Sequence, residues 1–312
     1  MFDLKPFTCQ PWLAEPSRFQ LMLAAAAGRK VPSVRQVEKQ AVKRMEQAPK
    51  LAAAKAVRAV KGRVGVINIS GIIEQHMTWM SMFLGGISCD EIAAQFDYLM
   101  SDPSIEAIVL HIDSPGGSTY GVEELGDKIY NARAKKPIYS IANSMAGSAA
   151  YWLATAAQTV CCTPGGDVGG VGVYAVHVSK KEAMKQAGIK VTLISAGRYK
   201  TEGNPYDDMD EEGAAYAQVG VDETYSKFVA TLSRNRHEVS KADVRAKFGE
   251  GRMVSADAAL AAKMIDQVCT FESLMQRLTG IGPASSARAI AGPTKAVLMA
   301  RQMHRERAAM SN

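Results

Sequence analysis

The chain of 312 residues contains few cysteines and no long hydrophobic run. Its five cysteines show neither the spacing of a disulfide framework nor that of a metal site, which predicts a reduced, cytoplasmic protein without a metal. No run reaches the roughly 18 apolar residues that a membrane span needs. The apolar segment 19–28 is also too short, and its flanks are wrong for a secretory signal peptide. Membrane-spanning and disulfide-rich proteins are therefore not expected.

Positive charge is concentrated at the two ends of the chain. Residues 1–62 carry 12 Lys/Arg against 4 Asp/Glu, and residues 281–312 carry 5 against 1, although the net charge is only +6. Basic ends can contact nucleic acid or an acidic partner, but the alanine-rich segment 29–61 favours a solvated helix or arm. We expect a basic, partly helical region over 1–62, a folded domain over 63–280 and a flexible basic tail over 281–312.

Strand patterns and helix patterns alternate through the middle of the chain. β-branched, apolar runs predict strands over residues 63–73, 107–113, 137–142 and 190–194. Helical spacing predicts helices over residues 89–100, 119–134, 178–187, 208–237, 255–263 and 272–278. This alternation indicates an α/β fold with a largely parallel sheet, in which functional loops follow the carboxyl ends of the strands.

Ser148 is the candidate nucleophile. It follows an apolar strand that is expected to break at Asn143-Ser144, and it precedes a helix-like stretch, AAYWLATAA, over residues 149–157. Its nearest neighbours in the chain are small residues, which would let a substrate backbone come close. A serine at such an elbow holds its hydroxyl beside free backbone N–H groups and the positive helix end, which favour a developing oxyanion. The alternative is a helix-capping serine, the commoner role for an isolated serine in this position.

Gly116 and Gly117 follow another strand, in the turn Ser114–Gly117. Two successive glycines can present their N–H groups to a carbonyl oxygen without a Cβ in the way, as an oxyanion hole requires. Because this turn and the Ser148 turn both follow strand carboxyl ends, we expect them to face one cleft. A plain turn is the alternative.

A base for Ser148 could be a histidine or a lysine. His111 lies inside a predicted strand and His177 just after another, so a Ser-His-Asp arrangement has no support. Lys200 lies beside Tyr199 in a loop between glycines. A lysine acts as a base only when it is neutral, and burial favours that form. The alternative is an ordinary solvated lysine.

The glycine-rich stretch Gly165–Tyr174 does not predict a nucleotide site. Its sequence, GGDVGGVGVY, is not followed by GK[ST], and no helix pattern opens directly after the glycines. No nucleotide or other cofactor is therefore expected.

Six motifs, taken in order, resemble the Ser-Lys dyad serine peptidases, which include signal peptide peptidase A and the prohead proteases of tailed phages. The motifs are GVINISGII, VLHIDSPGG, NSMAGSAAYWLA, GGVGVY, AGRYKTEGNPY and GRMVSADAALAAKMIDQV. They span about two thirds of the chain, from residue 63 to residue 268. The resemblance implies a Clp-protease/crotonase type of fold built from repeated ββα units, in agreement with the alternation of strands and helices.

The same resemblance implies a role for each candidate residue. Ser148 would be the nucleophile, Lys200 the general base, and the N–H groups of Gly116 or Gly117 with that of Ala149 the oxyanion hole. Peptide bonds would be hydrolysed through an acyl-enzyme, without a metal or nucleotide. Because a neutral Lys200 must be buried, a homo-oligomer is expected.

The resemblance is stronger to the phage members, of the lambda head-protease type. The pattern AGIKVTLISAGRYKTEGNPYDDMDEE is closer to theirs. We also expect no hydrophobic anchor of the kind that the membrane-bound bacterial members carry. One departure is Ala149-Ala150, where the family often has Gly-Gly. The expected function is capsid assembly proteolysis of scaffold, portal or coat proteins, in the host cytoplasm or transiently inside the procapsid.

Three other functions stay open at this point. A peptidase that degrades signal peptides would use the same residues. A crotonase-type acyl-CoA enzyme would share the oxyanion hole but use carboxylates instead of a Ser-Lys pair. A non-catalytic assembly protein would keep the fold for contacts between subunits, with Ser148 as a helix cap.

Overall fold

The computed structural model describes residues 12–14, 60–61, 63–77 and 85–280. Most of the expected basic N-terminal region and the whole expected tail after residue 280 lie outside the described residues. The chain divides into two units, residues 1–271 and residues 272–312, and the second contributes only 272–280 to the description. The domain boundaries expected at residues 62 and 280 stay a prediction.

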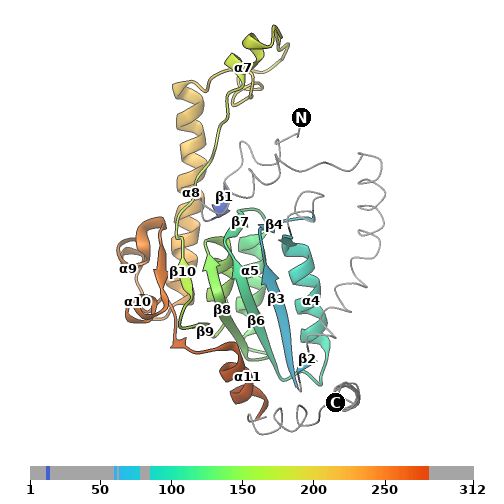
Figure 1. Ribbon diagram of the computed structural model, residues 1–312, viewed down its shortest axis with the longest axis vertical. Coiled ribbons are helices and arrows are strands. Elements are labelled where there is room, and N and C mark those ends of the chain that lie inside the picture. The colour runs from blue at the N-terminus through green and yellow to red at the C-terminus, as the bar shows by residue number, and fades with distance from the viewer. Residues whose placement is uncertain (1–11, 15–59, 62, 78–84, 281–312) are drawn as a thin grey trace, which may run out of the picture. The chain divides into compact units, whose positions relative to one another are not determined.

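The main sheet of the first unit is predominantly parallel (Figure 1). Its centre consists of β3 (Val64–Ser70), β6 (Ala107–Ser114) and β8 (Ile138–Gly147), which pair in parallel. The shorter strands are β2 (Val60–Lys61), β9 (Thr159–Cys162), β10 (Asp167–Gly169), β11 (Met253–Ser255) and β12 (Gln267–Val268). The predicted α/β fold with a largely parallel sheet is confirmed.

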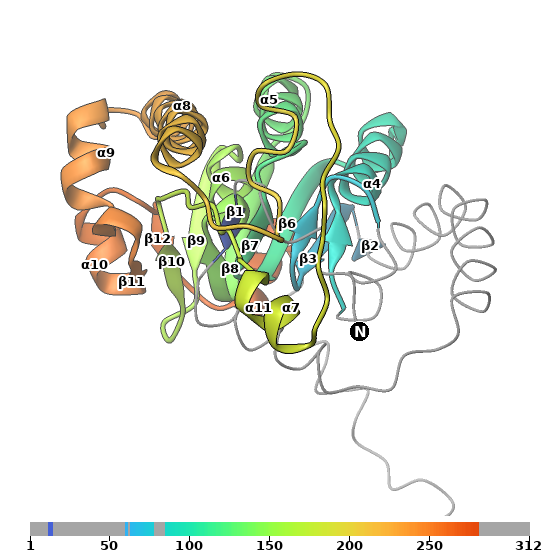
Figure 2. The same cartoon turned by 90° about the horizontal axis from the view of Figure 1, so that it is seen from above.

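Helices cover one face of this sheet (Figure 2). They are α4 (Cys89–Ser101), α5 (Val122–Ala132), α6 (Ala149–Thr155) and α8 (Glu211–Asn235). The core lies between sheet and helices, where Ile67, Leu110 and Ile112 are fully buried. Burial of each such side chain contributes roughly 1.5–3 kcal/mol. The β-branched runs therefore form strands because one face of each is covered by apolar helices.

Side-chain caps define the starts of several helices. Ser88 Oγ accepts a hydrogen bond from Glu91 N–H at 3.1 Å at the start of α4, and Asp210 caps α8 through Gly213 N–H at 2.8 Å. The remaining helices are α7 (Lys181–Gln186), α9 (Lys241–Lys247), α10 (Ala256–Ala261) and α11 (Phe271–Thr279). Among the described residues, no helix is long and apolar enough to cross a membrane.

A small second sheet lies at the carboxyl end of β6. Its strand order is β1 (Trp12–Ala14), β7 (Gly116–Ser118), β4 (Ile73–Glu74) and β5 (Ile87–Ser88). β7 pairs in parallel with β4 and antiparallel with β1. The chain therefore returns from its N-terminal region to the turn that contains the two glycines, a contact that no sequence pattern indicated.

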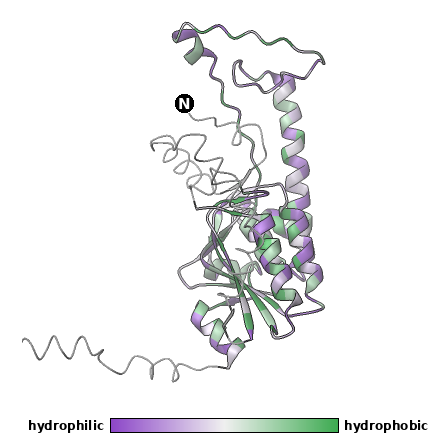
Figure 3. Cartoon of the chain, turned by 90° about the vertical axis from the view of Figure 1, so that its right-hand side faces the viewer, coloured by the Kyte–Doolittle hydropathy of each residue, from purple (hydrophilic) through white to green (hydrophobic). Residues whose placement is uncertain are grey.

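The strand predicted over residues 190–194 is wrong. This stretch is extended but pairs with no described strand, and every residue from 187 to 200 is exposed. It belongs to residues 175–210, here called the arm, which includes α7 at the far end of α8 (Figure 1). Apolar and polar positions alternate along part of the arm (Figure 3). The sequence has the period of a strand, but a strand also needs a neighbour for its backbone hydrogen bonds.

The expected break at Asn143-Ser144 is also wrong. β8 continues through these residues to Gly147, because its last three residues pair with β10. The chain is irregular at this point, since Ser144 has a φ of 95°. The strand before Ser148 therefore extends to Gly147, beyond the apolar residues 137–142 from which it was predicted.

Candidate active site

Ser148 lies at a strained elbow between β8 and α6. Its φ of 52° and ψ of −113° are unusual for a residue with a side chain, and the residue is 1% exposed. Its hydroxyl caps none of the α6 N–H groups, and among the described residues its hydrogen-bond partner is Gly172 O, at a long 3.5 Å. The capping alternative is thus not supported. Non-glycine residues with such backbone strain, about 1–3 kcal/mol each, cluster at functional sites.

The glycine-rich stretch after β10 encloses Ser148. Ser148 N–H donates to Gly169 O at 2.7 Å. Gly170 has a φ of 61°, and a Cβ added to it would lie 3.2 Å from Ser148 N and 3.6 Å from Ser148 Cβ. Close backbone approach to the serine explains why this stretch is rich in glycine. Sequence reasoning excluded a nucleotide site here but did not identify this role.

The turn with the two glycines lies beside the same elbow. Ser114 pairs with Ala146 across β6 and β8, and a Cβ added to Gly147 would lie 3.0 Å from Pro115 O. At Gly117, an added Cβ would lie 1.8 Å from Ile73 O, so no larger residue fits between β7 and β4. The structure therefore brings the two turns together.

The backbone N–H groups of this turn differ in their partners. Gly116 N–H donates to Ser114 Oγ at 3.1 Å, and this buried hydroxyl donates in turn to Gly71 O at 2.6 Å. Ala149 is the first residue of α6, so its N–H has no acceptor within the helix. Of the three candidate N–H groups, that of Gly116 is thus already bound, and Ser114 is a site residue that sequence reasoning missed.

Lys200 lies on the arm, away from any contact with Ser148. It is exposed, and its backbone N–H bonds to Gly197 O at 3.2 Å. Its neighbours Arg198 and Tyr199 both bind Glu212, at 3.0 and 2.7 Å. Within the described residues, no hydrogen bond or ion pair joins Lys200 Nζ to another group. A single copy of the chain therefore does not bring the candidate base to the candidate nucleophile.

In the part of the chain that the structure describes, no hydrogen bond joins either candidate histidine to Ser148. His111 Nδ1 lies 2.9 Å from Asn68 Oδ1 and its Nε2 lies 2.8 Å from Asn143 Nδ2. This arrangement fits the tautomer that carries its proton on Nδ1. His177 Nε2 donates to Asn204 O at 3.0 Å. Both rings thus form hydrogen bonds with other groups.

The sequence of this chain matches the models of two peptidase families. The family model for Peptidase family S49 matches residues 131–280, and that for Clp protease matches residues 68–166. The chain is a relative of these peptidases. The first match contains both Ser148 and Lys200, and the second contains the two-glycine turn and Ser148. The expected resemblance and the Clp-protease type of fold are confirmed.

Individual relatives include phage proteins. The chain is 32% identical over 180 residues to the head-tail preconnector protein GP5 of Enterobacteria phage P21, which covers 58% of this chain and 36% of that protein. It is 30% identical over 174 residues to capsid assembly protease C of Escherichia phage lambda, covering 56% and 40%. A putative protease of Methanocaldococcus jannaschii is 30% identical over 190 residues, covering 61% and 60%. The chain thus matches only part of each of these relatives.

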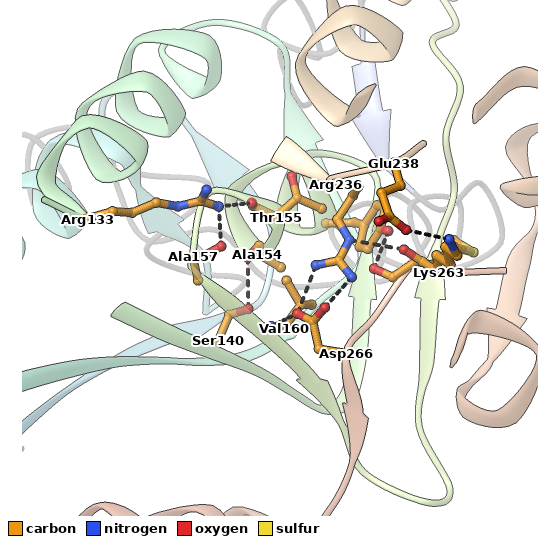
Figure 4. A network of polar contacts seen from close by, with 12 residues as sticks. Arg133, Ser140, Ala154, Thr155, Ala157, Val160, Arg236, Glu238, Lys263 and Asp266 are labelled. Atoms are coloured by element: carbon orange, nitrogen blue, oxygen red, sulfur yellow. Dashed lines mark hydrogen bonds and ion pairs between the residues drawn. The ribbon is translucent and has the colours of Figure 1, made fainter. Parts of the chain in front are cut away.

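A partly buried polar network holds the far end of the helix that begins after Ser148 (Figure 4). Arg133 donates to the carbonyl oxygens at the end of α6, those of Thr155, Ala156 and Ala157. Ser140 Oγ donates to Ala154 O at 2.8 Å. A cation beside the last carbonyls of a helix is favourable, because these groups carry the negative end of the helix dipole. In this S49 relative, α6 is thus held at both ends.

The same network contains a bidentate ion pair between Arg236 and Asp266 (Figure 4). The two nitrogen–oxygen distances are 2.9 and 2.7 Å, and Asp266 also accepts from Val160 N–H at 2.7 Å. Burial alone would raise the pKa of Asp266, but the hydrogen bonds from Arg236 and Val160 hold it below its ordinary value. The ion pair thereby joins the end of α8 to the segment after α10, beside the strand β9.

Proposed function

We propose that this protein is a serine endopeptidase with Ser148 as its nucleophile. The observation that supports this most directly is the elbow itself. A buried serine in a strained conformation has a weakly held hydroxyl, lies at the start of a helix and adjoins a turn of two glycines. Strain of this kind is compensated by the packed surroundings and aims the hydroxyl away from the helix backbone.

The oxyanion is proposed to form between Gly117 N–H and Ala149 N–H. Ala149 N–H is a first-turn donor at the positive end of α6, where negative charge is stabilised. Gly116 N–H already donates to Ser114 Oγ, so we assign it to holding the turn in place. Attack by Ser148 Oγ on a peptide carbonyl would then give an acyl-enzyme and release an amine, and water would release the acid.

Lys200 is proposed as the general base, in an assembled form of the protein. It must take the Ser148 proton and deliver it to the leaving amine, which requires a neutral side chain. Neutrality is favoured by burial, whereas the described chain leaves Lys200 exposed. A second copy of the chain packed against the arm would supply this burial. A homo-oligomer is therefore part of the proposal.

We propose phage capsid assembly as the biological setting, with scaffold, portal or coat proteins as substrates. Support comes from two relatives, named as a capsid assembly protease and a head-tail preconnector protein. No cofactor takes part in the proposed reaction. The protein would act in the host cytoplasm or inside the procapsid.

Mass spectrometry of cleavage products tests the proposal. Wild type, Ser148→Ala and Lys200→Ala are each incubated with scaffold, portal and coat proteins from the same source. Lys190→Ala is the matched control, because Lys190 is an equally exposed lysine of the arm. Products are expected with wild type and Lys190→Ala only. Identical products from all four proteins, or none from any, would overturn the peptidase assignment and favour a non-catalytic assembly protein.

The homo-oligomer is tested separately, by the dependence of specific activity on protein concentration. If a second copy completes the site, specific activity falls on dilution at the concentration where sedimentation shows dissociation. Specific activity that stays constant through dissociation would show that one chain suffices.

A further inference from the structure

The N-terminal segment of this chain forms a strand on the two-glycine turn. In β1, Trp12 lies opposite Ser118, Leu13 opposite Gly117 and Ala14 opposite Gly116, in antiparallel register. β7 is bonded to β4 on its other edge. Without β1, the backbone of residues 116–118 would therefore have one free edge. Residues 12–14 occupy that edge.

This edge belongs to the site described above. Residue 117 carries one of the proposed oxyanion donors, and residue 115 adjoins the elbow, with Pro115 O only 3.0 Å from a Cβ placed on Gly147. An extended peptide bound by backbone hydrogen bonds along β7 would run directly past Ser148. The two glycines offer no side chain that would keep such a peptide away.

From its amino to its carboxyl end, β1 runs toward the candidate nucleophile. Gly116 follows Pro115, whose carbonyl oxygen lies 3.0 Å from a Cβ placed on Gly147, so we take the Gly116 end of β7 as the end that faces the Ser148 elbow. Ala14, the last residue of β1, lies opposite Gly116. The chain thus runs from Trp12 toward Ser148 with its carboxyl end leading. A polypeptide substrate that added to the same edge in antiparallel register would run the same way. Both would need the same backbone groups, so they exclude each other.

We propose that residues 12–14 are a self-ligand of the active site, bound in place of a substrate strand. This inference rests on the proposed function, because it concerns the same site. The segment holds the peptide-binding edge of β7 until it is displaced, so that a single chain is autoinhibited. Its occupancy is intramolecular, and a polypeptide in solution must compete with a strand that is tethered to the enzyme.

The test removes the backbone donors of β1 from the full-length protein. Leu13→Pro/Ala14→Pro eliminates two successive N–H groups, so at least one hydrogen bond to β7 is lost whichever residue faces it. The control is Ala24→Pro/Ala25→Pro, which places the same two prolines in the N-terminal region but outside β1. Both pairs are made in wild type and in Ser148→Ala.

Two readouts separate this inference from the proposed function. The first is binding of a fluorescein-labelled peptide, QPWLAEPSR, which corresponds to residues 10–18, measured by anisotropy on the Ser148→Ala proteins. If the native strand occupies the edge in at least nine chains of ten, its loss should strengthen binding about tenfold or more. The second is the kcat/KM for fluorescent casein with active Ser148, which should rise by a similar factor.

The outcomes are distinct. Tighter peptide binding by Leu13→Pro/Ala14→Pro, and not by the control, supports the self-ligand even if none of the proteins cleaves casein, in which case only the proposed function fails. Equal peptide affinity for all three N-terminal sequences overturns the self-ligand even if casein is cleaved. Release of residues 1–14 by wild type, but not by Ser148→Ala, would further support a strand bound in the orientation of a substrate.

Discussion

The elbow that carries Ser148 and the arm that carries Lys200 differ in almost every physical respect. Ser148 is 1% exposed, its backbone is held by β10, and α6 is anchored by Arg133 at its other end. The arm has no buried residue in α7, and its ion pairs, such as Lys181 with Asp207 at 2.6 Å, are exposed. One half of the proposed dyad is thus preorganised within a single chain, and the other half is not.

Because of this contrast, we expect the two regions to affect different properties of the protein, namely its stability and its activity. Contacts around the elbow contribute to the folded state, because they are buried and cannot be replaced by water without loss. Exposed ion pairs contribute little. Substitutions near the elbow should therefore change unfolding, whereas those in the arm should change activity or association alone.

The largest effects are expected for the dyad itself. Ser148→Ala and Lys200→Ala should each reduce casein hydrolysis by at least about 10³-fold, because neither member replaces the other. Thermal unfolding should not change for Lys200→Ala, whose side chain is exposed and unpaired among the described residues. Full activity of purified Lys200→Ala would contradict the assignment of Lys200 as the general base.

The next effect concerns the ion pair between the buried Arg236 and the partly exposed Asp266. Arg236→Met removes the buried partner of Asp266, whose own side chain is 37% exposed. Loss of these charge-assisted hydrogen bonds should cost roughly 1.5–3 kcal/mol of unfolding free energy. Arg198→Met, which removes the exposed pair with Glu212, is the matched control and should cost less than about 1 kcal/mol. Urea unfolding measures both; equal losses would contradict the distinction.

The same variant has a defined pH dependence. Since Arg236 and Val160 lower the pKa of Asp266 in the folded state, the pair stabilises the fold above the unfolded-state pKa, and this contribution is lost as pH falls through the folded-state pKa. The stability difference between wild type and Arg236→Met should thus be largest near neutral pH and shrink in acid. A difference that grows on acidification would contradict the assignment.

A smaller effect is expected at the glycines around Ser148. Gly170→Ala forces a φ of 61° on a residue with a Cβ, placed 3.2 Å from Ser148 N. It should destabilise the protein by about 1–2 kcal/mol and lower activity, because the elbow must shift. Gly165→Ala has no atom within 4 Å of the added Cβ and should change neither. Urea unfolding and casein hydrolysis of both variants are compared with wild type.

The strain at the elbow can be measured with a matched pair. Ser148→Gly and Ser148→Ala both lack the hydroxyl, but only glycine adopts the φ of 52° without cost. The free energy of unfolding should therefore be about 1 kcal/mol larger for the glycine variant than for the alanine variant. A more stable alanine variant would show that the elbow is not strained.

The smallest effect on stability is expected in the arm. Ile194 is 97% exposed, so Ile194→Glu should leave thermal unfolding of the monomer unchanged. If the arm is covered by a second copy, the same change should weaken self-association in sedimentation experiments. Tyr216→Glu, at a 75% exposed site on α8, is the control. Unaltered association of Ile194→Glu would exclude this part of the arm from the interface.

Much of the fold was predictable because it follows from local patterns. The helix at residues 89–100 and the strand at 107–113 were placed within one residue of α4 and β6, since each has apolar side chains at the spacing of its element. The strand at residues 190–194 was predicted on the same grounds and does not form. The periodicity was present, but the neighbouring strand that would satisfy its backbone was not.

The candidate site was predictable in part. Ser148 was identified from a strand, a turn and a run of small residues that are contiguous in the chain. The unusual density of glycine at residues 169–172 is typical of a close backbone approach. It did not indicate that the residue approached is Ser148. No sequence signal pointed to Ser114, because serine is common in turns. Its hydrogen bonds to Gly71 O and from Gly116 N–H are visible only in the structure.

By itself, the sequence determined the central strands and the helices between them, the elbow at Ser148 and the resemblance to a peptidase family. These depend on residues close together in the chain, whose spacing sets which face is apolar and where a helix begins. Only the tertiary structure decided that residues 12–14 lie on β7, that the glycines after β10 enclose Ser148, and that Lys200 remains exposed. Those contacts join segments far apart in the chain, and their free energy comes from close packing and backbone pairing that no local pattern encodes.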